Sequence, residues 1–342
     1  MFVNNLHYVI IFYLYTQDES LNRKNISTSR QLIKNVENFL SIHNYFYFKK
    51  FSSSSTFYGW GRKKSGLKAV ALSKKYQTTC TLLEDGFIRS LDLGLNNSPS
   101  FSLVEDDIGI YYDATAPSKL ENILSAYDFN SDDTLIKTAT NAMSLIKKHH
   151  ISKYNNAPDI NDDFFKSDTK SKVLIVAQTA GDASLEYGLA EKFSTKKMIE
   201  DALQENPNAS VYIKIHPDVL VGKKESDISM DDIPTNCTVL DEDVNPISLL
   251  KHFDKVYIKT SGMGMEALVL GLEVICYGMP YYAGWGLTQD KQHCERRKRE
   301  LSVTELFTGS YILYSRYYNP YKKRPSDIID TIEEIIKQKK ML

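Results

Sequence analysis

The chain has 342 residues, 42% of them apolar and 25% charged, which is the profile of a water-soluble globular protein long enough for two domains. The formal net charge of −1 argues against a general nucleic-acid-binding protein, which would be basic. The four cysteines form no CxxC pair, which argues against a zinc site and favours a reduced, cytosolic protein.

The first predicted element is an apolar run at residues 9–15, which we interpret as a buried strand. It lacks the basic leader and the small-residue cleavage site of a signal peptide. It is also much shorter than the roughly 20 apolar residues that cross a bilayer. No other stretch has the length and hydropathy of a membrane span, so we expect any membrane association to be peripheral.

Residues 27–40 have the apolar spacing of a helix, residues 45–51 are aromatic and predict a strand, and residues 67–76 predict another helix. A glycine-rich, cationic loop lies between the predicted strand at 45–51 and the predicted helix at 67–76. Its first residues are Gly59, Trp60, Gly61 and Arg62. This loop could approach an anionic ligand closely, but a plain surface turn is equally compatible with it.

A short apolar strand at residues 81–83 ends at two adjacent carboxylates, Glu84 and Asp85, and Arg89 lies four residues beyond Asp85. In open α/β sheets, ligands bind outside the carboxyl ends of the strands, so Asp85 stands where chemistry usually occurs. An acidic pair that merely caps a turn is the alternative. Further helices are predicted at residues 114–126 and 131–151.

Residues 152–171 are polar and predict an interdomain linker, after which strands and helices alternate. Apolar runs predict strands at 172–177, 210–215, 255–258 and 273–277. Helical patterns occupy 192–204, 246–253, 268–271 and 326–337. This alternation in both halves predicts two α/β domains.

Three loops of the second half follow strand ends and should converge on one crevice: 178–184, 216–217 and 260–266. Thr260, Ser261 and Gly262 precede a helix, where hydroxyls, backbone N–H groups and the helix dipole favour a phosphate, although the same residues make an ordinary helix cap. Lys214 and His216 lie on one face of their strand.

Glu266, early in the helix, could accept ribose hydroxyls or simply complement the helix dipole. A second Gly-Trp-Gly loop surrounds Trp285. The sequence contains neither a Walker A motif nor a dinucleotide fingerprint, and its acidic clusters are interpreted as solvated turns. We therefore expect no metal and no cofactor.

Several motifs together resemble the capsule polysaccharide β-Kdo transferases of the KpsC type. LEDGFIRS, GWGRKKSG and DDIGIYYDATAPSKLE resemble the N-terminal half of these enzymes. QTAGDAS, KIHPD, KTSGMGMEAL and YAGWGLTQD, followed by Arg296 and Arg297, resemble their nucleotide-binding half. The match extends from Tyr58 to Tyr321. Capsule enzymes of this type typically carry two such modules, whereas this sequence carries one.

The resemblance implies an α/β fold of the GT-B class, with two Rossmann-like domains facing a central cleft. We expect an N-terminal domain at 1–160 with the catalytic Asp and the acceptor side, and a CMP-sugar-binding domain at 171–310. A C-terminal segment at 311–342 would pack back on the N-terminal domain.

The resemblance also implies a donor, CMP-β-Kdo, and a retaining reaction through a covalent intermediate on Asp85, with Glu84 and Arg89 beside it. Arg89 or Arg62 would meet the Kdo carboxylate. The residues assigned to the donor site lie at strand ends or at a helix start: Gln178, Gly181, Asp182, Ser184, Lys214, His216, Pro217, Thr260, Ser261, Gly262, Gly264 and Glu266. The Gly59–Arg62 loop and Trp285 are further substrate-loop candidates.

The expected acceptor is a Kdo-terminated or other glycan, lipid-linked, and no nucleic acid is expected as a partner. We expect a cytoplasmic enzyme, peripheral on the inner membrane, in contact with the membrane or with capsule export machinery. Arg296–Arg299 or the Lys-rich C-terminal helix could touch anionic headgroups, although a solvated surface is the alternative and is preferred for the helix. A CMP-sialic-acid transferase and a non-catalytic nucleotide- or sugar-binding assembly protein remain alternative functions.

Overall fold

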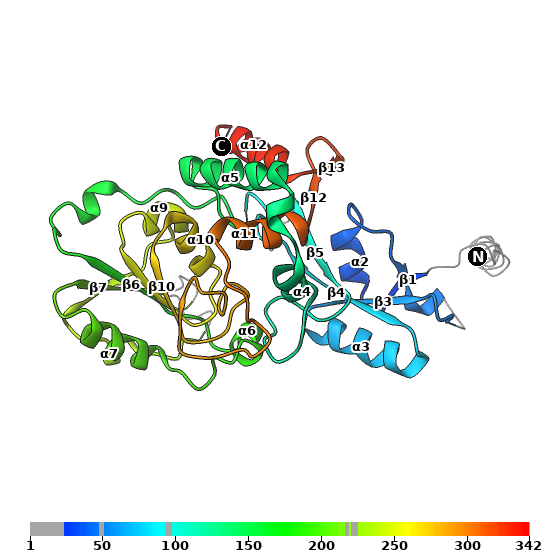
Figure 1. Ribbon diagram of the computed structural model, residues 1–342, viewed down its shortest axis with the longest axis horizontal. Coiled ribbons are helices and arrows are strands. Elements are labelled where there is room, and N and C mark those ends of the chain that lie inside the picture. The colour runs from blue at the N-terminus through cyan, green and yellow to red at the C-terminus, as the bar shows by residue number, and fades with distance from the viewer. Residues whose placement is uncertain (1–23, 48–50, 93–97, 216–218, 220–224, 342) are drawn as a thin grey trace, which may run out of the picture. The chain divides into compact units, whose positions relative to one another are not determined.

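The computed structural model in Figure 1 describes residues 24–47, 51–92, 98–215, 219 and 225–341. The strand predicted at residues 9–15 lies outside these ranges. The chain divides into two compact units. The first comprises Met1–Glu84 with Glu105–Ile108, and the second comprises Asp85–Val104 with Gly109–Leu342.

The described part of the first unit contains a parallel set of strands with the order β2-β1-β3-β4. These strands are β1 (Asn25–Ser27), β2 (His43–Asn44), β3 (Thr56–Trp60) and β4 (Thr79–Asp85). The helices are α2 (Arg30–Val36) and α3 (Lys64–Tyr76). Ile26, Phe57 and Ala69 form the centre of the apolar core, because strands and helix turn their apolar faces inward.

The prediction of a strand at residues 45–51 is wrong at its start, because Tyr45–Tyr47 forms a 3-10 turn. The Asn44 side chain accepts a hydrogen bond from the backbone N–H of Phe46 at 3.1 Å, which favours a turn over an extended strand. The Tyr45 ring stacks on Phe51 and both lie near Phe57, so these aromatic side chains cover the core of the first unit.

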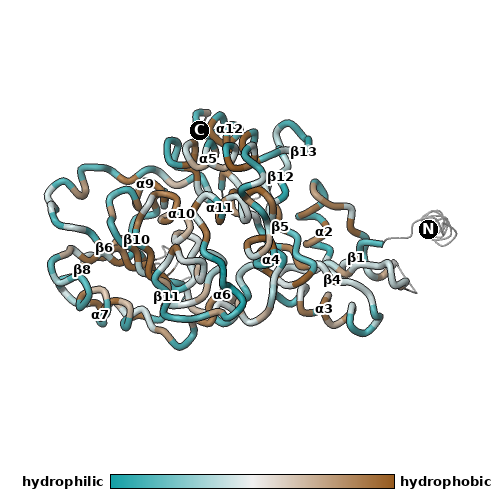
Figure 2. The backbone as a smooth tube through the Cα atoms, viewed as in Figure 1, coloured by the Kyte–Doolittle hydropathy of each residue, from teal (hydrophilic) through white to brown (hydrophobic). Residues whose placement is uncertain are grey.

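The second unit contains a six-stranded parallel sheet in the order β11-β10-β9-β6-β7-β8. Its strands are β6 (Lys172–Val176), β7 (Ser210–Lys214), β8 (Cys237–Leu240), β9 (Lys255–Ile258), β10 (Glu273–Cys276) and β11 (Gln289–Asp290). The accompanying helices are α6 (Ala183–Tyr187), α7 (Thr195–Glu205), α9 (Pro246–Leu250) and α10 (Met263–Leu270). The central strands are apolar along their length, as the brown segments at β6 and β10 show in Figure 2, because helices cover both faces of such sheets.

The second unit also holds β5 (Ser102–Asp106, of which Ser102–Val104 belong to it), β12 (Ser315–Asn319) and β13 (Arg324–Ser326), which pair antiparallel in the order β5-β12-β13. Its remaining helices are α4 (Lys119–Ala126), α5 (Asp133–His149), α11 (Val303–Phe307), the π-helix Thr308–Leu313 and α12 (Ile328–Lys339). In Figure 1, α12 lies beside α5, and the two helices are in contact.

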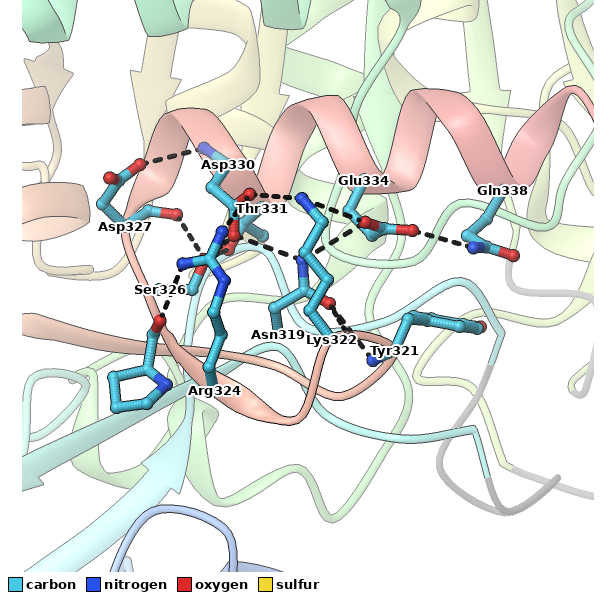
Figure 3. Close-up of polar contacts among 11 residues, drawn as sticks. Asn319, Tyr321, Lys322, Arg324, Ser326, Asp327, Asp330, Thr331, Glu334 and Gln338 are labelled. Carbon is cyan, nitrogen blue, oxygen red and sulfur yellow. Dashed lines mark hydrogen bonds and ion pairs between the residues drawn. The ribbon is translucent and has the colours of Figure 1, made fainter.

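A polar network fastens α12 to the β12–β13 hairpin, as Figure 3 shows. Asn319, which is fully buried, donates to Asp330 at 3.2 Å and to Glu334 at 3.3 Å. Lys322 donates to Asp330 at 2.6 Å, and Ser326 donates to the same carboxylate at 2.7 Å. The C-terminal segment is therefore an integral part of the second unit. Among the described residues, no helix has the length and hydropathy required to cross a bilayer.

Candidate active site

Asp85 is the last residue of β4, and the chain turns there because Gly86 follows it. A Cβ at position 86 would lie 2.2 Å from the Ser102 hydroxyl oxygen, so only glycine fits beside β5. Arg89 donates through Nε to the Asp85 carboxylate at 2.9 Å. The same guanidinium donates to the Ser90 hydroxyl at 2.8 Å, which fixes its orientation. The structure therefore brings the predicted Asp85 and Arg89 together as an ion pair.

Glu84, the residue before Asp85, contacts the glycine-rich loop of the first unit. Its carboxylate accepts a hydrogen bond from the indole N–H of Trp60 at 2.7 Å. Gly59 lies so close to the start of α3 that a Cβ would approach the Ser65 carbonyl oxygen to 2.4 Å, and Gly61 has a φ of +37°. Glu84 thus positions the Trp60 loop, a role that its sequence position did not indicate.

Gln178 connects two of the loops that were predicted to converge. Its side-chain nitrogen donates to the Ser184 hydroxyl at 2.8 Å. Its side-chain oxygen accepts from both the backbone N–H of Thr260, at 3.2 Å, and the Thr260 hydroxyl, at 3.0 Å. The Ser184 and Thr260 hydroxyls are 2.9 Å apart. The loops after β6 and β9 therefore form one polar cluster at the carboxyl end of the six-stranded sheet.

Gly181 and Asp182 shape this loop. Gly181 adopts a φ of +76°, in the left-handed region that glycine favours. Asp182 caps α6 by accepting a hydrogen bond from the backbone N–H of Ser184 at 2.9 Å, and it also accepts from Gln178 at 3.2 Å. Asp182 therefore orients the loop that carries Gln178 and Ser184.

The start of α10 is open at Gly262 and tightly packed at Gly264. A Cβ at Gly262 would meet nothing within 4 Å, and Gly262, as the N-cap residue, makes no side-chain cap hydrogen bond. A Cβ at Gly264 would lie 2.2 Å from the Tyr282 hydroxyl and 2.4 Å from the Ile258 side chain. Ser261 accepts a hydrogen bond from the backbone N–H of Met263 at 3.3 Å. The exposed helix start is the part of this motif that a phosphate could approach.

Lys214, at the end of β7, donates to the backbone carbonyl of Glu242 at 3.1 Å. Burial lowers the pKa of its ammonium group, against the attraction of Asp243, Glu242 and Asp241. His216 and Pro217, which the sequence places beside it, lie outside the described residues.

Glu266, on α10, lines a small cavity together with Ser152. The Ser152 hydroxyl donates to the Glu266 carboxylate, and Phe87 and Tyr311 contribute apolar walls. Burial raises the pKa of Glu266 to about 7, although the Ser152 hydrogen bond acts in the opposite direction. Sequence reasoning missed Ser152, because it lies 114 residues away from Glu266 in a stretch interpreted as linker.

The Trp285 side chain lies in the core. Its side chain is fully buried, and its indole N–H donates to the Tyr281 carbonyl at 2.9 Å. The Arg297 guanidinium lies 5.8 Å from the Trp285 ring and donates to the carbonyls of Pro280 and Ala283. The structure gives this second Gly-Trp-Gly loop a packing role.

Three of the four residues of Arg296–Arg299, which could touch anionic headgroups or form a solvated surface, bind acceptors within the second unit. Arg296 donates to Glu121 at 2.5 Å, and the buried Arg297 donates to the same carboxylate at 3.2 Å. Arg299 donates to the Tyr127 carbonyl at 2.7 Å. A run of cations in sequence resembles a solvated patch, but here internal acceptors bind it.

No cluster of three or more histidine, cysteine or carboxylate side chains that could hold a metal occurs among the residues that the structure describes. The described residues supply a carboxylate held by an arginine at one strand end, and hydroxyl, amide and helix-start donors at others. Such donors suit the charge of a phosphate, and the carboxylate suits attack on an electrophilic carbon.

The fold and these strand-end groups define an α/β protein of the GT-B class, as predicted. The chain belongs to the capsule polysaccharide biosynthesis protein family, whose sequence profile matches residues 56–317.

Two solved structures are similar over nearly the whole chain. The Thermosulfurimonas dismutans KpsC β-Kdo 2,4 transferase is 41% identical with a TM-score of 0.85, covering 92% of this chain and 98% of that one. The β-Kdo 2,7 transferase of the same KpsC is 28% identical with a TM-score of 0.70, covering 92% and 99%. The predicted resemblance to KpsC-type transferases is confirmed.

Curated relatives include the capsule polysaccharide modification protein LipA of Neisseria meningitidis serogroup A, which is 43% identical over 283 residues. This match covers 80% of the chain but only 40% of LipA. The lipopolysaccharide-processing protein LpsZ of Rhizobium meliloti is 38% identical over 256 residues, covering 74% of the chain and 58% of LpsZ. The chain thus spans about 40% of the length of LipA.

Proposed function

We propose that this protein is a retaining β-Kdo glycosyltransferase that transfers Kdo from CMP-β-Kdo to a hydroxyl group of a growing bacterial surface glycan. Membership of the capsule polysaccharide family and the Kdo-transferase fold support sugar transfer. The observation that carries the proposal is the Asp85 carboxylate at the end of β4, held by Arg89 at 2.9 Å.

In the first step, an Asp85 carboxylate oxygen attacks the anomeric carbon of Kdo, and the bond to the phosphate of CMP breaks with its electron pair leaving on CMP. In the second step, an acceptor hydroxyl oxygen attacks the same carbon, the bond to Asp85 breaks, and the hydroxyl proton passes to a base. Each step inverts the configuration of the anomeric carbon, so the two steps together retain it. Arg89 keeps the carboxylate oriented for the first step.

Charge develops on the phosphate of CMP as it leaves. We assign the stabilisation of this charge to Lys214, His216 and the helix start at 260–262. Cations and N–H donors close to a leaving group lower the activation barrier for its departure. Gln178 and Ser184 hold the Thr260 loop in place. Arg89 or Arg62 would bind the Kdo carboxylate.

The proposed reaction uses neither a metal nor a cofactor. Its acceptor would be a Kdo-terminated or other glycan, lipid-linked, such as a capsule linker. The proposed location is the cytoplasmic face of the inner membrane, with the protein attached peripherally or in contact with capsule export machinery.

Intact-mass measurement tests the donor, the reaction class and the nucleophile together. The full chain is mixed with freshly generated CMP-Kdo, beside the Asp85→Asn variant. We expect the wild type to gain the mass of one Kdo residue and to release CMP, and we expect the variant to do neither. CMP release without an adduct on the wild type indicates turnover through a short-lived intermediate, and rapid quenching must then trap the adduct if Asp85 is the nucleophile.

Folded wild-type protein that yields neither an adduct nor CMP would overturn the proposal. CMP-sialic acid is then the donor to test. Binding of CMP without turnover of either donor would instead identify a non-catalytic binding protein.

A further inference from the structure

Helix α3 carries a basic face with no acidic residue near it in sequence. Residues 38–83 contain eight lysines and arginines and not one aspartate or glutamate, although the whole chain has a net charge of −1. The first unit as a whole contains twelve lysines and arginines and seven aspartates and glutamates, a net charge of +5 that the rest of the chain balances. Such asymmetry points to an anionic partner for this part of the molecule.

The lysines of α3 gather on its solvent side. Lys64, Lys68 and Lys75 follow the i, i+4, i+11 spacing of one helix face, and Lys74 flanks them. All four are exposed, as is Lys63 at the N-cap. The residues of the opposite face, Gly66, Ala69 and Ser73, are buried. We define the basic face as Lys63, Lys64, Leu67, Lys68, Lys74 and Lys75.

No lysine of the basic face forms an ion pair with a carboxylate among the described residues. Lys75 lies over the ring of its neighbour Tyr76, at 5.3 Å from the centroid. Leu67, in the middle of the face, leaves 50% of its surface exposed. An apolar side chain among unpaired cations is an arrangement that suits the boundary between headgroups and acyl chains.

We infer that the basic face of α3 docks the protein on an anionic phospholipid surface. A 13-residue helix presents a straight face of about 20 Å, which fits a flat bilayer surface. The cations of the face are all lysines, which act as point charges, and the face includes neither the arginine forks nor the stacking aromatic rings that recognise nucleic acid. This inference rests on the proposed peripheral location, but it does not require Kdo transfer.

Sedimentation with lipid vesicles tests the inference on the full chain. The vesicles are phosphatidylcholine with about one third phosphatidylglycerol, or phosphatidylcholine alone, at low and high salt. The test variant combines Lys64→Gln, Lys68→Gln and Lys75→Gln. The matched control combines Lys137→Gln, Lys147→Gln and Lys148→Gln on α5, where the three lysines are also exposed.

We expect the wild type to bind anionic vesicles and to lose this binding on neutral vesicles and at high salt. Each cation near an anionic surface contributes about fivefold in affinity, so the α3 variant should bind at least roughly tenfold more weakly. The α5 control should bind like the wild type. Leu67→Ser should weaken binding by about threefold without changing its salt dependence. Asp85→Asn should bind normally, which separates failure of catalysis from failure of docking.

Equal binding by the wild type and the α3 variant would overturn the inference, as would equal losses in the α3 and α5 variants. Absence of wild-type binding to anionic vesicles would overturn it as well. If the protein binds an RNA oligonucleotide more tightly than vesicles at equal phosphate concentration, the partner of the basic face is a nucleic acid and the inference is wrong. Unchanged thermal unfolding of both triple variants serves as the folding control, since every substituted side chain is exposed.

Discussion

At the scale of single residues, the candidate site depends on side chains that hold other side chains in place. Arg89 fixes Asp85, Glu84 fixes Trp60, and Gln178 fixes Thr260. The spacing of four residues already placed Arg89 beside Asp85, but the partners of Glu84 and Gln178 could not be read from the motifs, because each of these partners lies on a different strand end or loop. A side chain such as Gln178, which joins two loops, has no periodic signal in the sequence.

Glu266 gives a residue-scale prediction about pH. Its pKa is raised from 4.5 to about 7 by burial, so the folded state holds the proton more tightly than the unfolded state. The resulting stability is complete below about pH 4.5 and is lost as the pH rises through 7. We expect Glu266→Gln to flatten the decline in unfolding free energy between pH 5 and 8, by up to about 3 kcal/mol.

Urea unfolding at several pH values measures this effect. Glu191→Gln, at an exposed position, is the control and should follow the wild type. If the wild type and Glu266→Gln show the same pH dependence, the Glu266 carboxyl titrates normally, and its burial beside Ser152 does not raise its pKa.

At the scale of elements, the apolar runs that predicted strands at 172–177, 210–215, 255–258 and 273–277 correspond to β6, β7, β9 and β10. Continuous apolar strands and their helices have strong local patterns, so the α/β class was predictable. The segment 45–51 was not, because aromatic residues that cover a core and aromatic residues that pair in a sheet look alike in sequence. The internal partner of Arg296 was not predicted either, because Glu121 lies 175 residues away from it in the sequence.

The start of α10 supports a prediction that separates packing from binding. Gly264→Ala should destabilise the protein by about 1–3 kcal/mol, because its Cβ would collide with the Tyr282 hydroxyl. Gly262→Ala should change stability by less than about 0.5 kcal/mol, because its Cβ points into open space. It should nevertheless weaken CMP binding several-fold, by narrowing the approach to the helix start.

Thermal unfolding and calorimetric titration with CMP measure the two effects on the same samples. Equal stability losses in both variants would contradict the packing difference at α10. Normal CMP binding by Gly262→Ala would place the phosphate elsewhere in the polar cluster.

At the scale of the whole chain, the last thirty or so residues complete the second unit. Strand β12 pairs with β5, more than 200 residues earlier, and α12 contacts α5. Such long-range pairing could not be derived from local patterns. The amphipathic character of residues 326–337 predicted that one face is buried, and Ile328, Ile332 and Ile335 are indeed buried. The hydrogen bonds that Asp330 of α12 accepts from the β12–β13 hairpin were not predicted.

Asp330 therefore gives a prediction for how the C-terminal segment is held. Partial burial raises the pKa of its carboxyl, but hydrogen bonds from Lys322, Ser326 and Asn319 outweigh this effect and lower the pKa to about 2. Stabilisation by this group is present above its ordinary value of 3.8 and is lost as the pH falls towards 2. After allowance for solvent screening, Asp330→Asn should cost about 1–2 kcal/mol at pH 7 and much less near pH 2.

Urea unfolding at both pH values checks this difference, with Asp133→Asn at an exposed position of α5 as the control. A loss that is the same at pH 7 and near pH 2 would mean that the amide of the Asp330→Asn variant disturbs packing and that the lost charge is not the cause. A negligible loss at pH 7 would mean that the buried isoleucines of α12 hold the C-terminal segment without help from the network in Figure 3. The apolar face then suffices, because burial of three isoleucine side chains contributes several kcal/mol without any ion pair.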